Sequence, residues 1–405
     1  MIILTLNCGS SSVKYSVFNT AHGTMLARGI VERVGLTGSF ISHTVGTHEV
    51  KIEIKCLNHK VAIEHVLKLL VSSSDGILEN ITEVNAVGHR VVHGGEFFIE
   101  STIINEEVED VIAELSTLAP LHNPANLQGI QAARDVLPKI PHVAVFDTAF
   151  HQTLPEYAFR YAIPSRWYDE KKIRKYGFHG TSHFYVSQRA MQLLGDSMKK
   201  SRIISLHLGN GVSITAIKDG KSIDTSMGLT PLEGLIMGTR SGDLDPGVIL
   251  YMMRSENLSP EELDAILNRK SGLIGITTTS DMRDIEKKAT EGDEKSHLAL
   301  KMAVYRVQKY IGAYTVALGG LNAIIFTAGI GENSPTFRNH VLKDLEFLGI
   351  KLDEKANKKA IGGKEDQIIS ADSSDVKILV IPTNEELVMA QDVENVILRR
   401  NIKIP

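Results

Sequence analysis

Residues 3–17 read ILTLNCGSSSVKYSV, and residues 203–217 read IISLHLGNGVSITAI. Each segment contains an apolar run, a turn of small polar residues and a second run with the composition of a β-strand. An offset of 200 residues matches Ile3 with Ile203, Leu4 with Ile204, Leu6 with Leu206, Gly9 with Gly209, and Val17 with Ile217. Over so short a window, a chance similarity is the alternative. A true repeat predicts two related domains, each opening with a hairpin whose tip exposes backbone N–H groups.

Strand and helix patterns alternate along the rest of the chain. Apolar runs of strand length occur at Ile2–Leu6, Ala86–Val92, His142–Phe146, Ile203–Leu208, Ala323–Thr327 and Lys377–Ile381. Apolar residues at helical spacing occur at Val61–Val71, Val108–Leu118, Asn126–Val136, His183–Leu194, Pro260–Leu267, His297–Leu318 and Glu385–Arg400. This alternation predicts the α/β class.

The composition excludes several classes of protein. The 405 residues carry 44 Lys and Arg against 48 Asp and Glu, a net charge of −4, whereas a nucleic-acid-binding protein needs a cationic surface. At about 100–200 residues per domain, the length predicts two domains. The only two cysteines are Cys8 and Cys56, so we expect a reducing compartment and no disulfide framework.

Two segments bear on the location of the protein. Residues Met1–Leu6 contain no cationic leader and no cleavage site, so we expect a cytoplasmic protein. The stretch Tyr310–Gly331 has no charged residue and is long enough to cross a bilayer, but glycines and Asn322 interrupt it. We therefore expect no membrane association. The predicted structure here is a helix ending near Gly319, the buried strand Ala323–Thr327 and a glycine-rich turn.

The turns of the two hairpins have the composition of phosphate-binding loops. The first, Asn7–Ser12, has three consecutive hydroxyl groups and is followed by Lys14, whose ammonium group suits phosphate oxygens. The second, His207–Gly211, adds the amide of Asn210. Small residues let backbone amides converge on an anion, although ordinary hairpins use the same residues. Two such tips facing each other would bind a polyphosphate.

A third glycine-rich element, Phe326–Ser334, follows an apolar strand. Its spacing Gly-x-Gly-x-x-Ser lacks the third glycine of a dinucleotide-binding fingerprint, and the chain has no Walker pattern Gly-x-x-x-x-Gly-Lys-Ser/Thr. We therefore expect the backbone at its two glycines to lie flat against a purine or a ribose.

Two arginines have unusual surroundings. Arg90 stands at the end of an apolar strand, before paired glycines, and Arg240 lies in a loop rich in Gly, Asp and Pro. Taken singly, such an arginine is typically the partner of a structural carboxylate. Together with the phosphate-type turns, the pair predicts a guanidinium clamp around a transferring phosphoryl group. Asp147 directly follows the strand His142–Phe146, and α/β sheets bind ligands at the C-terminal ends of their strands.

Histidines and glutamates supply the remaining candidates. His122 and His179 lie in loops beside proline or glycine, where an imidazole can donate to phosphate or carboxylate oxygens. The i, i+4 spacing of His179 and His183 also suits zinc, but no Glu lies between them and no further ligand is near. The last strand leads into Glu385-Glu386. These residues either favour the N-terminus of the following helix or reach a magnesium ion through water.

Three long segments resemble the acetokinase family of the actin, Hsp70 and sugar kinase superfamily: Asn7–Lys14, Gly88–Gly95 and Met227–Asp243. The resemblance covers essentially the whole chain, and no position that carries the family's chemistry departs from it. It implies two duplicated actin-like domains of the ribonuclease H type with an active-site cleft between them. The expected domains are residues 1–150 with 385–405, and residues 151–384.

The resemblance also implies a reaction. Enzymes of this family transfer a phosphoryl group reversibly from ATP to acetate, giving acetyl phosphate and ADP, with Mg²⁺ or, in its place, Mn²⁺. They look like homodimers joined through the second domain. A propionate kinase of the same family is the alternative activity, and pyrophosphate is an alternative donor. From a different class, the alternative is an ATP-driven conformational module of the Hsp70 or actin kind.

The family's functional residues fall on matching positions of this chain. The matching catalytic positions are Arg90, Asp147, His179 and Arg240. The positions around the acceptor are Arg90, Val92, Leu121, His122, Phe178 and Pro231. The ATP-binding positions are Ser12, Lys14, His207, Leu208, Gly209, Asn210, Gly211, Asp281, Met282, Arg283, Gly329, Ile330, Gly331, Glu332 and Asn333. The metal positions are Asn7 and Glu385.

The chemistry of the acceptor bears on the role of Asp147. A carboxylate with a reference pKa of about 4 is ionised at pH 7, so its attack needs no strong general base. The obstacle is repulsion between two anions, which cations must neutralise and hold in line. In enzymes of this family, the residue that matches Asp147 is assigned as a proton donor or acceptor. We instead expect Asp147 to orient Arg90 or a metal-bound water.

Overall fold

The structure is a computed structural model that describes all residues except 121, 196–199, 364 and 403–405. The chain divides into two compact units, Met1–Ala149 with Asn384–Pro405, and Phe150–Thr383. The 3₁₀-helix η3 (Ala149–Thr153) spans the boundary between them.

The first unit contains an eight-stranded sheet in the order β5-β4-β3-β2-β1-β6-β8-β7. Its strands are β1 (Ile2–Gly9), β2 (Ser12–Asn19), β3 (Thr24–Glu32), β4 (Phe40–Val45), β5 (His48–Glu53), β6 (Ala86–Val91), β7 (Thr102–Ile103) and β8 (His142–Phe146). The strands β1 to β5 form an antiparallel meander, whereas β6 pairs in parallel with β1 and β8. The C-terminal ends of β1, β6 and β8 therefore meet at one edge of the sheet.

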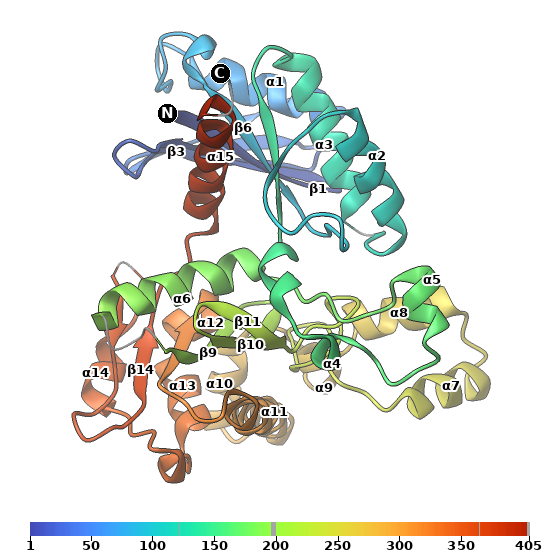
Figure 1. Ribbon diagram of the computed structural model, residues 1–405, viewed down its shortest axis with the longest axis vertical. Coiled ribbons are helices and arrows are strands. Elements are labelled where there is room, and N and C mark those ends of the chain that lie inside the picture. The colour runs from blue at the N-terminus through green and yellow to red at the C-terminus, as the bar shows by residue number, and fades with distance from the viewer. Residues whose placement is uncertain (121, 196–199, 364, 403–405) are drawn as a thin grey trace. The chain divides into compact units, whose positions relative to one another are not determined.

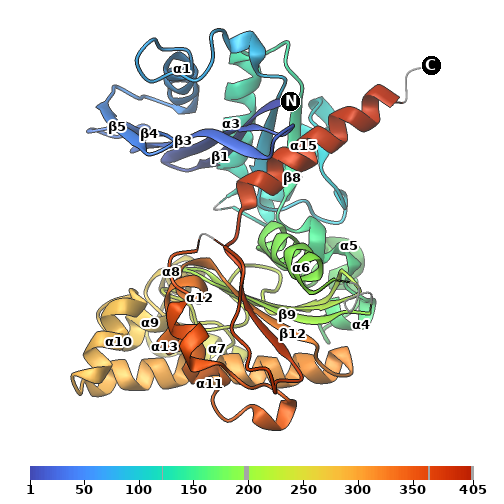
Figure 2. The ribbon, with the colours of Figure 1, turned by 90° about the vertical axis from the view of Figure 1, so that its left-hand side faces the viewer.

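Helices cover both faces of this sheet. They are α1 (His59–Leu70), α2 (Glu106–Glu114), α3 (Asn123–Val136) and α15 (Glu385–Ile402), with the 3₁₀-helices η1 (Ile81–Glu83) and η2 (Leu115–Thr117). Because side chains alternate along a strand, Leu4 and Leu6 of β1 join the core under α1 and α3, and Ile3 joins the core under α15. Figure 2 shows α15 running across the sheet. The chain's last helix thus belongs to the first unit.

The second unit contains a six-stranded sheet in the order β11-β10-β9-β12-β14-β13. Its strands are β9 (Arg202–Leu208), β10 (Val212–Lys218), β11 (Lys221–Thr225), β12 (Ala323–Thr327), β13 (Gln367–Ile368) and β14 (Lys377–Val380). The helix α6 (Gly180–Leu194) packs on one face through Val186 and Ala190, and the long helix α11 (Glu294–Leu318) covers the other (Figure 1).

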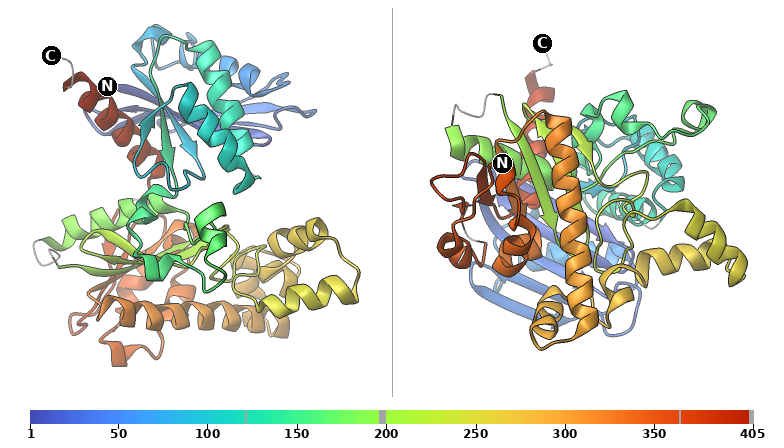
Figure 3. Two further views of the ribbon diagram at one scale, coloured as in Figure 1. Left: turned by 45° about the vertical axis from the view of Figure 1, so that its right-hand side comes forward. Right: turned by 90° about the horizontal axis from the view of Figure 1, so that it is seen from below.

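Shorter helices complete the second unit. They are α4 (Glu156–Phe159), α5 (Arg166–Lys171), α7 (Pro246–Ser255), α8 (Pro260–Arg269), α9 (Gly272–Ile276), α10 (Met282–Thr290), α12 (Ala328–Asn333), α13 (Pro335–Leu342), the 3₁₀-helix η5 (Glu346–Leu348) and α14 (Glu354–Lys359). In Figure 3, α7 and α8 extend to one side of the sheet. Among the described residues, no helix is both long enough and apolar enough to cross a membrane.

The two sheets share one topology. The order β3-β2-β1-β6-β8 of the first unit corresponds to β11-β10-β9-β12-β14 of the second, with the same antiparallel and parallel pairings. The matched segments 3–17 and 203–217 form the equivalent hairpins β1–β2 and β9–β10. The predicted α/β class and the predicted duplication are therefore confirmed.

Some local predictions were wrong. The glycine-rich stretch after β12 is the short helix α12 and not a turn. Its first residue, Ala328, has a left-handed φ of 63°, and Glu332 accepts a hydrogen bond from the Ala328 amide. The helix predicted at Val108–Leu118 is divided into α2 and η2. The strands β3 to β5 were not predicted, since their partly exposed residues form no continuous apolar run.

Candidate active site

The β1–β2 hairpin places two candidate residues side by side. Asn7 and Lys14 are opposite each other in the antiparallel register, so their side chains leave the same face of the sheet. The ammonium group of Lys14 is exposed and has no hydrogen-bond or ion-pair partner among the described residues. Ser12 begins β2 and lies opposite Gly9. This tip therefore presents a cation, an amide and a hydroxyl group.

Arg90 and Asp147 meet at the C-terminal ends of the parallel strands β6 and β8. Arg90 Nε donates to Asp147 Oδ1 at 3.0 Å and to Oδ2 at 3.1 Å, and Nη2 donates to Oδ2 at 2.6 Å. The carboxylate of Asp147, and then the charges of Glu385 and Glu386, raise the pKa of the Arg90 guanidinium despite its burial. The Nη1 group has no hydrogen-bond partner among the described residues.

A cavity of about 330 Å³ joins these groups within the first unit. Asn7, Lys14, Arg90, Glu385 and Glu386 all line it. Burial raises the pKa of Glu385 to about 7, with help from two neighbouring carboxylates and against the positive charges of Arg90 and Lys14. Burial thus disfavours the charged form of this carboxylate, and a cation bound beside it would favour that form.

Glu385 is also the first residue of α15, where its charge favours the helix N-terminus. The side chain that caps this end is Asn384, whose Oδ1 accepts from the amide of Leu387 at 3.1 Å. Glu385 is thus not needed as the cap. Both readings of the glutamate pair, helix start and metal site, remain compatible with its position.

The start of α3 holds the segment that follows Arg90. Asn126 Oδ1 accepts from the Val92 amide at 3.1 Å, and Asn126 Nδ2 donates to the Cys8 carbonyl at 2.8 Å. Asn123 binds both backbone groups of His93, accepting from its amide at 3.1 Å and donating to its carbonyl at 3.0 Å. Neither asparagine was predicted as a functional residue, although Asn123-Pro124 beside His122 was the available signal in the sequence.

The predicted acceptor residues of the first unit surround this segment. His122 precedes α3, and the Val92 side chain is buried. Leu121 lies outside the described residues. Whether these residues contact an acceptor stays a prediction.

In the second unit, the turn between β9 and β10 is tightly closed. The Gly209 amide donates to the Gly211 carbonyl at 3.1 Å, and the Gly238 amide donates to the Asn210 carbonyl at 3.2 Å. A Cβ atom on Gly238 would collide with Asn210 Oδ1. Leu208 is buried at the end of β9. Glycine is thus required where the Arg240 loop passes the phosphate-type turn.

His179 lies against the same turn. It precedes α6 with a left-handed φ of 56°, a conformation that is uncommon outside glycine and recurs at functional sites. Its ring stacks on His207 with centroids 4.1 Å apart. A methyl group on Gly211 would lie 3.2 Å from His179 Nε2 and 3.7 Å from Arg240 Nη1. His179 and Arg240 therefore both lie beside Gly211 in the turn.

Arg240 has no carboxylate partner among the described residues. Its Nη1 donates to the Pro231 carbonyl at 3.3 Å and contacts Met237 Sδ at 3.9 Å. Partial burial lowers the pKa of its guanidinium. A half-buried cation without a counter-ion is costly, and an anionic ligand would relieve that cost. Phe178, also predicted at the acceptor, is buried next to His179.

The predicted adenosine residues lie on the starts of two helices. Asp281 caps the N-terminus of α10, which begins at Met282. Its side chain accepts from the Arg283 amide at 2.9 Å and pairs with the Arg283 guanidinium at 2.6 Å. Met282 and Ile330 of α12 help line an apolar cavity of about 20 Å³. Gly329 is open, with nothing within 4 Å of an added Cβ.

The two side chains at the end of α12, Glu332 and Asn333, make hydrogen bonds within the protein. Glu332 accepts from the amides of Ala328 at 2.8 Å and Thr383 at 3.1 Å, and Asn333 donates to the Gly329 carbonyl at 2.9 Å. These contacts shape the glycine-rich element. Contact of either side chain with adenosine stays a prediction.

A buried arginine that the sequence analysis missed supports α12. Arg338, on α13, donates from Nη1 to the Gly331 carbonyl at 2.7 Å and from Nε to Asn357 Oδ1 at 2.8 Å. Its Nη2 donates to the carbonyls of Asn357 at 2.9 Å and Ala360 at 2.7 Å. Burial lowers its pKa to about 10. No sequence motif marks this residue.

Sequence comparisons agree along the whole chain. A sequence model of the acetokinase family matches residues 2–391. An acetate kinase from Dictyoglomus turgidum is 53% identical over 405 residues, which is 100% of this chain and 99% of that protein. An acetate kinase from Thermotoga maritima is 53% identical over 399 residues, with coverage of 98% and 99%.

Solved structures give the same result. The crystal structure of an acetate kinase from Porphyromonas gingivalis matches with a TM-score of 0.93 and 46% identity, over 98% of this chain and 99% of that one. A propionate kinase from Francisella tularensis matches with a TM-score of 0.91 and 41% identity, over 97% and 99%.

Proposed function

The chain belongs to the acetokinase family, and we propose that it transfers the γ-phosphoryl group of ATP to acetate, giving acetyl phosphate and ADP. The observation that carries this proposal is the half-buried Arg240, which lacks a carboxylate partner among the described residues and converges with His179 on the Gly209–Gly211 turn. A cation placed against a backbone turn suits a phosphoryl group whose charge is spread over its three equatorial oxygens during transfer.

On the donor side, the second unit supplies the groups for ATP. The turn Leu208–Gly211 binds phosphate oxygens, and the starts of α10 and α12 flank the adenosine. Arg240 and His179 donate hydrogen bonds to the transferring group, and they count most in the transition state, because the charge on that group is then most dispersed.

On the acceptor side, the first unit supplies Arg90. Asp147 occupies Nε and one edge of Nη2, which fixes the plane of the guanidinium and leaves Nη1 for the acetate carboxylate. Asp147 therefore acts by orienting Arg90. It need not take a proton, because acetate is already ionised at neutral pH.

The donor set in the first unit fits a magnesium ion. Mg²⁺ prefers oxygen ligands and is held by one or two carboxylates together with waters and substrate phosphates. Asn7 and Glu385 offer an amide oxygen and a carboxylate on one cavity. When bound, Mg²⁺, or Mn²⁺ in its place, neutralises part of the phosphate charge.

Acetate is the preferred acceptor in this proposal, and propionate is the second candidate because a structural relative is described as a propionate kinase. We propose that Val92 and His122 of the first unit contact the acceptor. Phe178 and Pro231 of the second unit, and Leu121, which lies outside the described residues, are assigned to the acceptor from the family's pattern alone.

Two further proposals concern the whole protein. We propose a homodimer formed through the second unit, because α7 has no buried residue and exposes Val248, Leu250 and Tyr251. An apolar helix of this kind is typical of an interface between subunits. We also propose a cytoplasmic location, which suits Cys8 and Cys56 since both thiols are buried and neither is in a disulfide.

A hydroxamate assay tests the activity. The protein is incubated with ATP, Mg²⁺ and acetate, and hydroxylamine traps the acyl phosphate. We expect acyl hydroxamate well above the blank without acetate, and less with propionate. Slow ATP hydrolysis that is independent of either acid, with no hydroxamate formed, would point to a conformational ATPase instead.

A further inference from the structure

A buried chain of hydrogen bonds leads from His179 into the core of the second unit. His179 Nδ1 lies 2.9 Å from Ser213 Oγ, and Ser213 Oγ lies 2.8 Å from His183 Nε2. The other ring nitrogen of His183, Nδ1, lies 3.0 Å from Ser205 Oγ. The chain therefore has four members, and only its first member lies at the predicted site.

The inner members are sealed from water. Ser205, Ser213 and His183 are fully buried. Burial holds the pKa of His183 well below its usual value, and the neighbouring histidines His151 and His207 lower it further. His183 is therefore neutral, with one N–H group and one lone pair in its ring.

The direction of each hydrogen bond in the chain follows from Ser205, its innermost member. Among the described residues, the only hydrogen-bond partner of the Ser205 hydroxyl group is His183 Nδ1. A buried hydroxyl hydrogen without an acceptor is costly, so Ser205 donates to His183 Nδ1. The single N–H of His183 is then on Nε2 and donates to Ser213 Oγ.

These directions then determine which ring nitrogen of His179, the outermost member, carries the proton. Ser213 has already accepted from His183, and its own hydrogen goes to His179 Nδ1. His179 Nδ1 is then an acceptor and carries no hydrogen, which leaves the proton of the neutral ring on Nε2. Nε2 belongs to the edge of the ring that faces Gly211 and lies near Arg240.

We propose that Ser205, His183 and Ser213 are positioning residues that hold His179 as its Nε2–H tautomer. His179 then meets the transferring phosphoryl group as a hydrogen-bond donor and cannot accept a proton from the substrate. The opposite tautomer would place a lone pair against the phosphoryl oxygens and repel them. The role of His179 as a donor to the phosphoryl group rests on the proposed function. The tautomer of its ring does not.

The tautomer of the wild-type protein is the first test. The full chain is labelled with ¹⁵N-histidine, and long-range proton–nitrogen correlation spectra distinguish the two neutral forms. The signals of His179 are assigned as those missing from a His179→Gln variant. We expect a protonated Nε2 and an unprotonated Nδ1. A protonated Nδ1 in the neutral ring would overturn the proposal without any activity measurement.

Variants of the chain give the second test. Ser213→Ala removes the donor to Nδ1, so we expect a mixture of tautomers. We expect kcat to fall about 10-fold, less than the ~10²–10⁴-fold that a positioned proton donor contributes, because part of the His179 population keeps the Nε2–H form. The KM for ATP should change less than twofold, because the phosphate turn is intact. Ser213→Thr restores the hydroxyl group and should recover the single tautomer and most of kcat.

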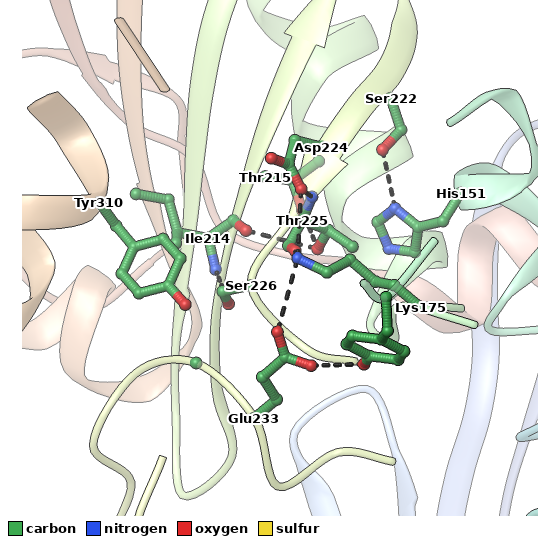
Figure 4. Close-up of polar contacts among 12 residues, drawn as sticks. His151, Lys175, Ile214, Thr215, Ser222, Asp224, Thr225, Ser226, Glu233 and Tyr310 are labelled. Carbon is green, nitrogen blue, oxygen red and sulfur yellow. Dashed lines mark hydrogen bonds and ion pairs between the residues drawn. The ribbon is translucent and has the colours of Figure 1, made fainter. Parts of the chain in front are cut away.

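A matched control separates positioning from stability. Ser222 donates to His151 Nδ1 at 2.9 Å (Figure 4), and His151 Nε2 bonds to the Phe178 carbonyl at 3.0 Å, so this pair lies outside the chain that ends at His179. Ser222→Ala loses the same kind of buried serine–histidine bond. We expect it to lower the melting temperature as Ser213→Ala does while leaving kcat and the His179 spectrum unchanged.

Ser205→Ala tests whether Ser205 sets the direction of the hydrogen bonds in the chain. It touches neither His179 nor the phosphate turn, yet it frees His183 to exchange its tautomers, so a second tautomer of His179 should become visible. A Ser213→Ala protein with an unchanged His179 spectrum and an unchanged kcat would contradict the proposal. If the wild-type protein forms no acyl phosphate, the proposed function fails, whereas the tautomer spectra still decide the inference.

Discussion

At the scale of single residues, Arg240 carries a half-buried charge that no described carboxylate neutralises. We expect Arg240→Ala to lower kcat by about 10³-fold, because an arginine at a transferring phosphoryl group acts mainly in the transition state. The KM for ATP should rise only a few-fold. Steady-state kinetics at saturating acetate measure both, with Arg240→Lys as the variant that keeps the charge. An unchanged kcat in Arg240→Ala would make Arg240 a structural residue.

A second prediction for a single residue is that Val92 influences the choice between acetate and propionate. A pocket that excludes one methylene discriminates by about 1–3 kcal/mol, so acetate should be preferred over propionate by roughly 10–200-fold in kcat/KM. Val92→Ala should shift this ratio toward propionate and leave the KM for ATP unchanged, since the Val92 backbone remains held by Asn126. Equal losses for both acids would show that Val92 only packs the core.

The sequence predicted individual residues better than their partners. Arg90 and Asp147 were each recognised by position at a strand end, and the expected contact between them is present at 2.6 Å. Asn123, Asn126 and Arg338 were not recognised. Each binds backbone groups that are distant in sequence, and such contacts leave no local spacing or motif to read.

At the scale of elements, His151 joins the segment before α6 to β11 and gives a pH dependence. Burial, with a smaller contribution from the charge of Lys175, lowers its pKa to about 4 against the opposing effect of the hydrogen bond to the Phe178 carbonyl. Between pH 6.5 and 4 the unfolded chain binds a proton here that the folded chain does not, so the free energy of unfolding falls as the pH drops through this window. The loss is at most about 1.4 kcal/mol per pH unit for this group.

Urea unfolding at pH 7 and pH 4.5 measures this effect. His151→Gln removes the titrating group and should reduce the difference in unfolding free energy between the two pH values. Part of the difference will remain, since burial also lowers the pKa of His142 to about 4. An identical difference in the wild-type protein and the variant would show that His151 is not responsible.

Arg338 gives a second prediction for elements, because it connects α12, α13 and α14. Arg338→Met leaves several buried carbonyl groups without donors, so we expect a loss of roughly 3 kcal/mol in the free energy of unfolding. The KM for ATP should also rise, since the Gly331 carbonyl loses its support in α12. Arg399→Met, which removes an exposed ion pair with Glu100, should change neither quantity. A similar KM in both variants would contradict a role for Arg338 at the site.

Element types followed from sequence where the apolar pattern was continuous. The buried strands β8 and β12 were predicted with the bounds that the structure shows. The helix α12 was predicted as a turn, because its two glycines outweigh the helix signal in so short a segment. What forms the helix is the contact of Glu332 with the Ala328 and Thr383 amides, and Thr383 is far away in sequence.

At the scale of the whole molecule, the exposed apolar helix α7 is proposed to join two subunits. Tyr251→Asp places a charge on this surface, where Tyr251 is 68% exposed, so we expect it to convert a dimer into a monomer. Size-exclusion chromatography with light scattering measures the mass against the 44.5 kDa of one chain. Tyr157→Asp, at a residue that is 90% exposed on α4, is the control and should remain dimeric. A wild-type protein of monomer mass would refute the proposed dimer.

The duplication of the fold was predictable because the two hairpins keep the same spacing of apolar residues and glycines. The number of strands in each sheet was not, since β3 to β5 have few buried residues and their pairing depends on the β2 edge. The side chains gathered at each site were predictable only through the resemblance to a family, because they come from distant segments.

The central claim is that this chain moves a phosphoryl group from ATP to the carboxylate oxygen of acetate. Acetate labelled with ¹⁸O in both oxygens, together with ATP and Mg²⁺, tests it directly, with the product observed by ³¹P nuclear magnetic resonance. Attack by the carboxylate places one ¹⁸O atom in the bridge between carbon and phosphorus, so we predict acetyl phosphate whose phosphorus signal is shifted by one heavy oxygen. Formation of unlabelled inorganic phosphate alone, with no acetyl phosphate, would contradict the account.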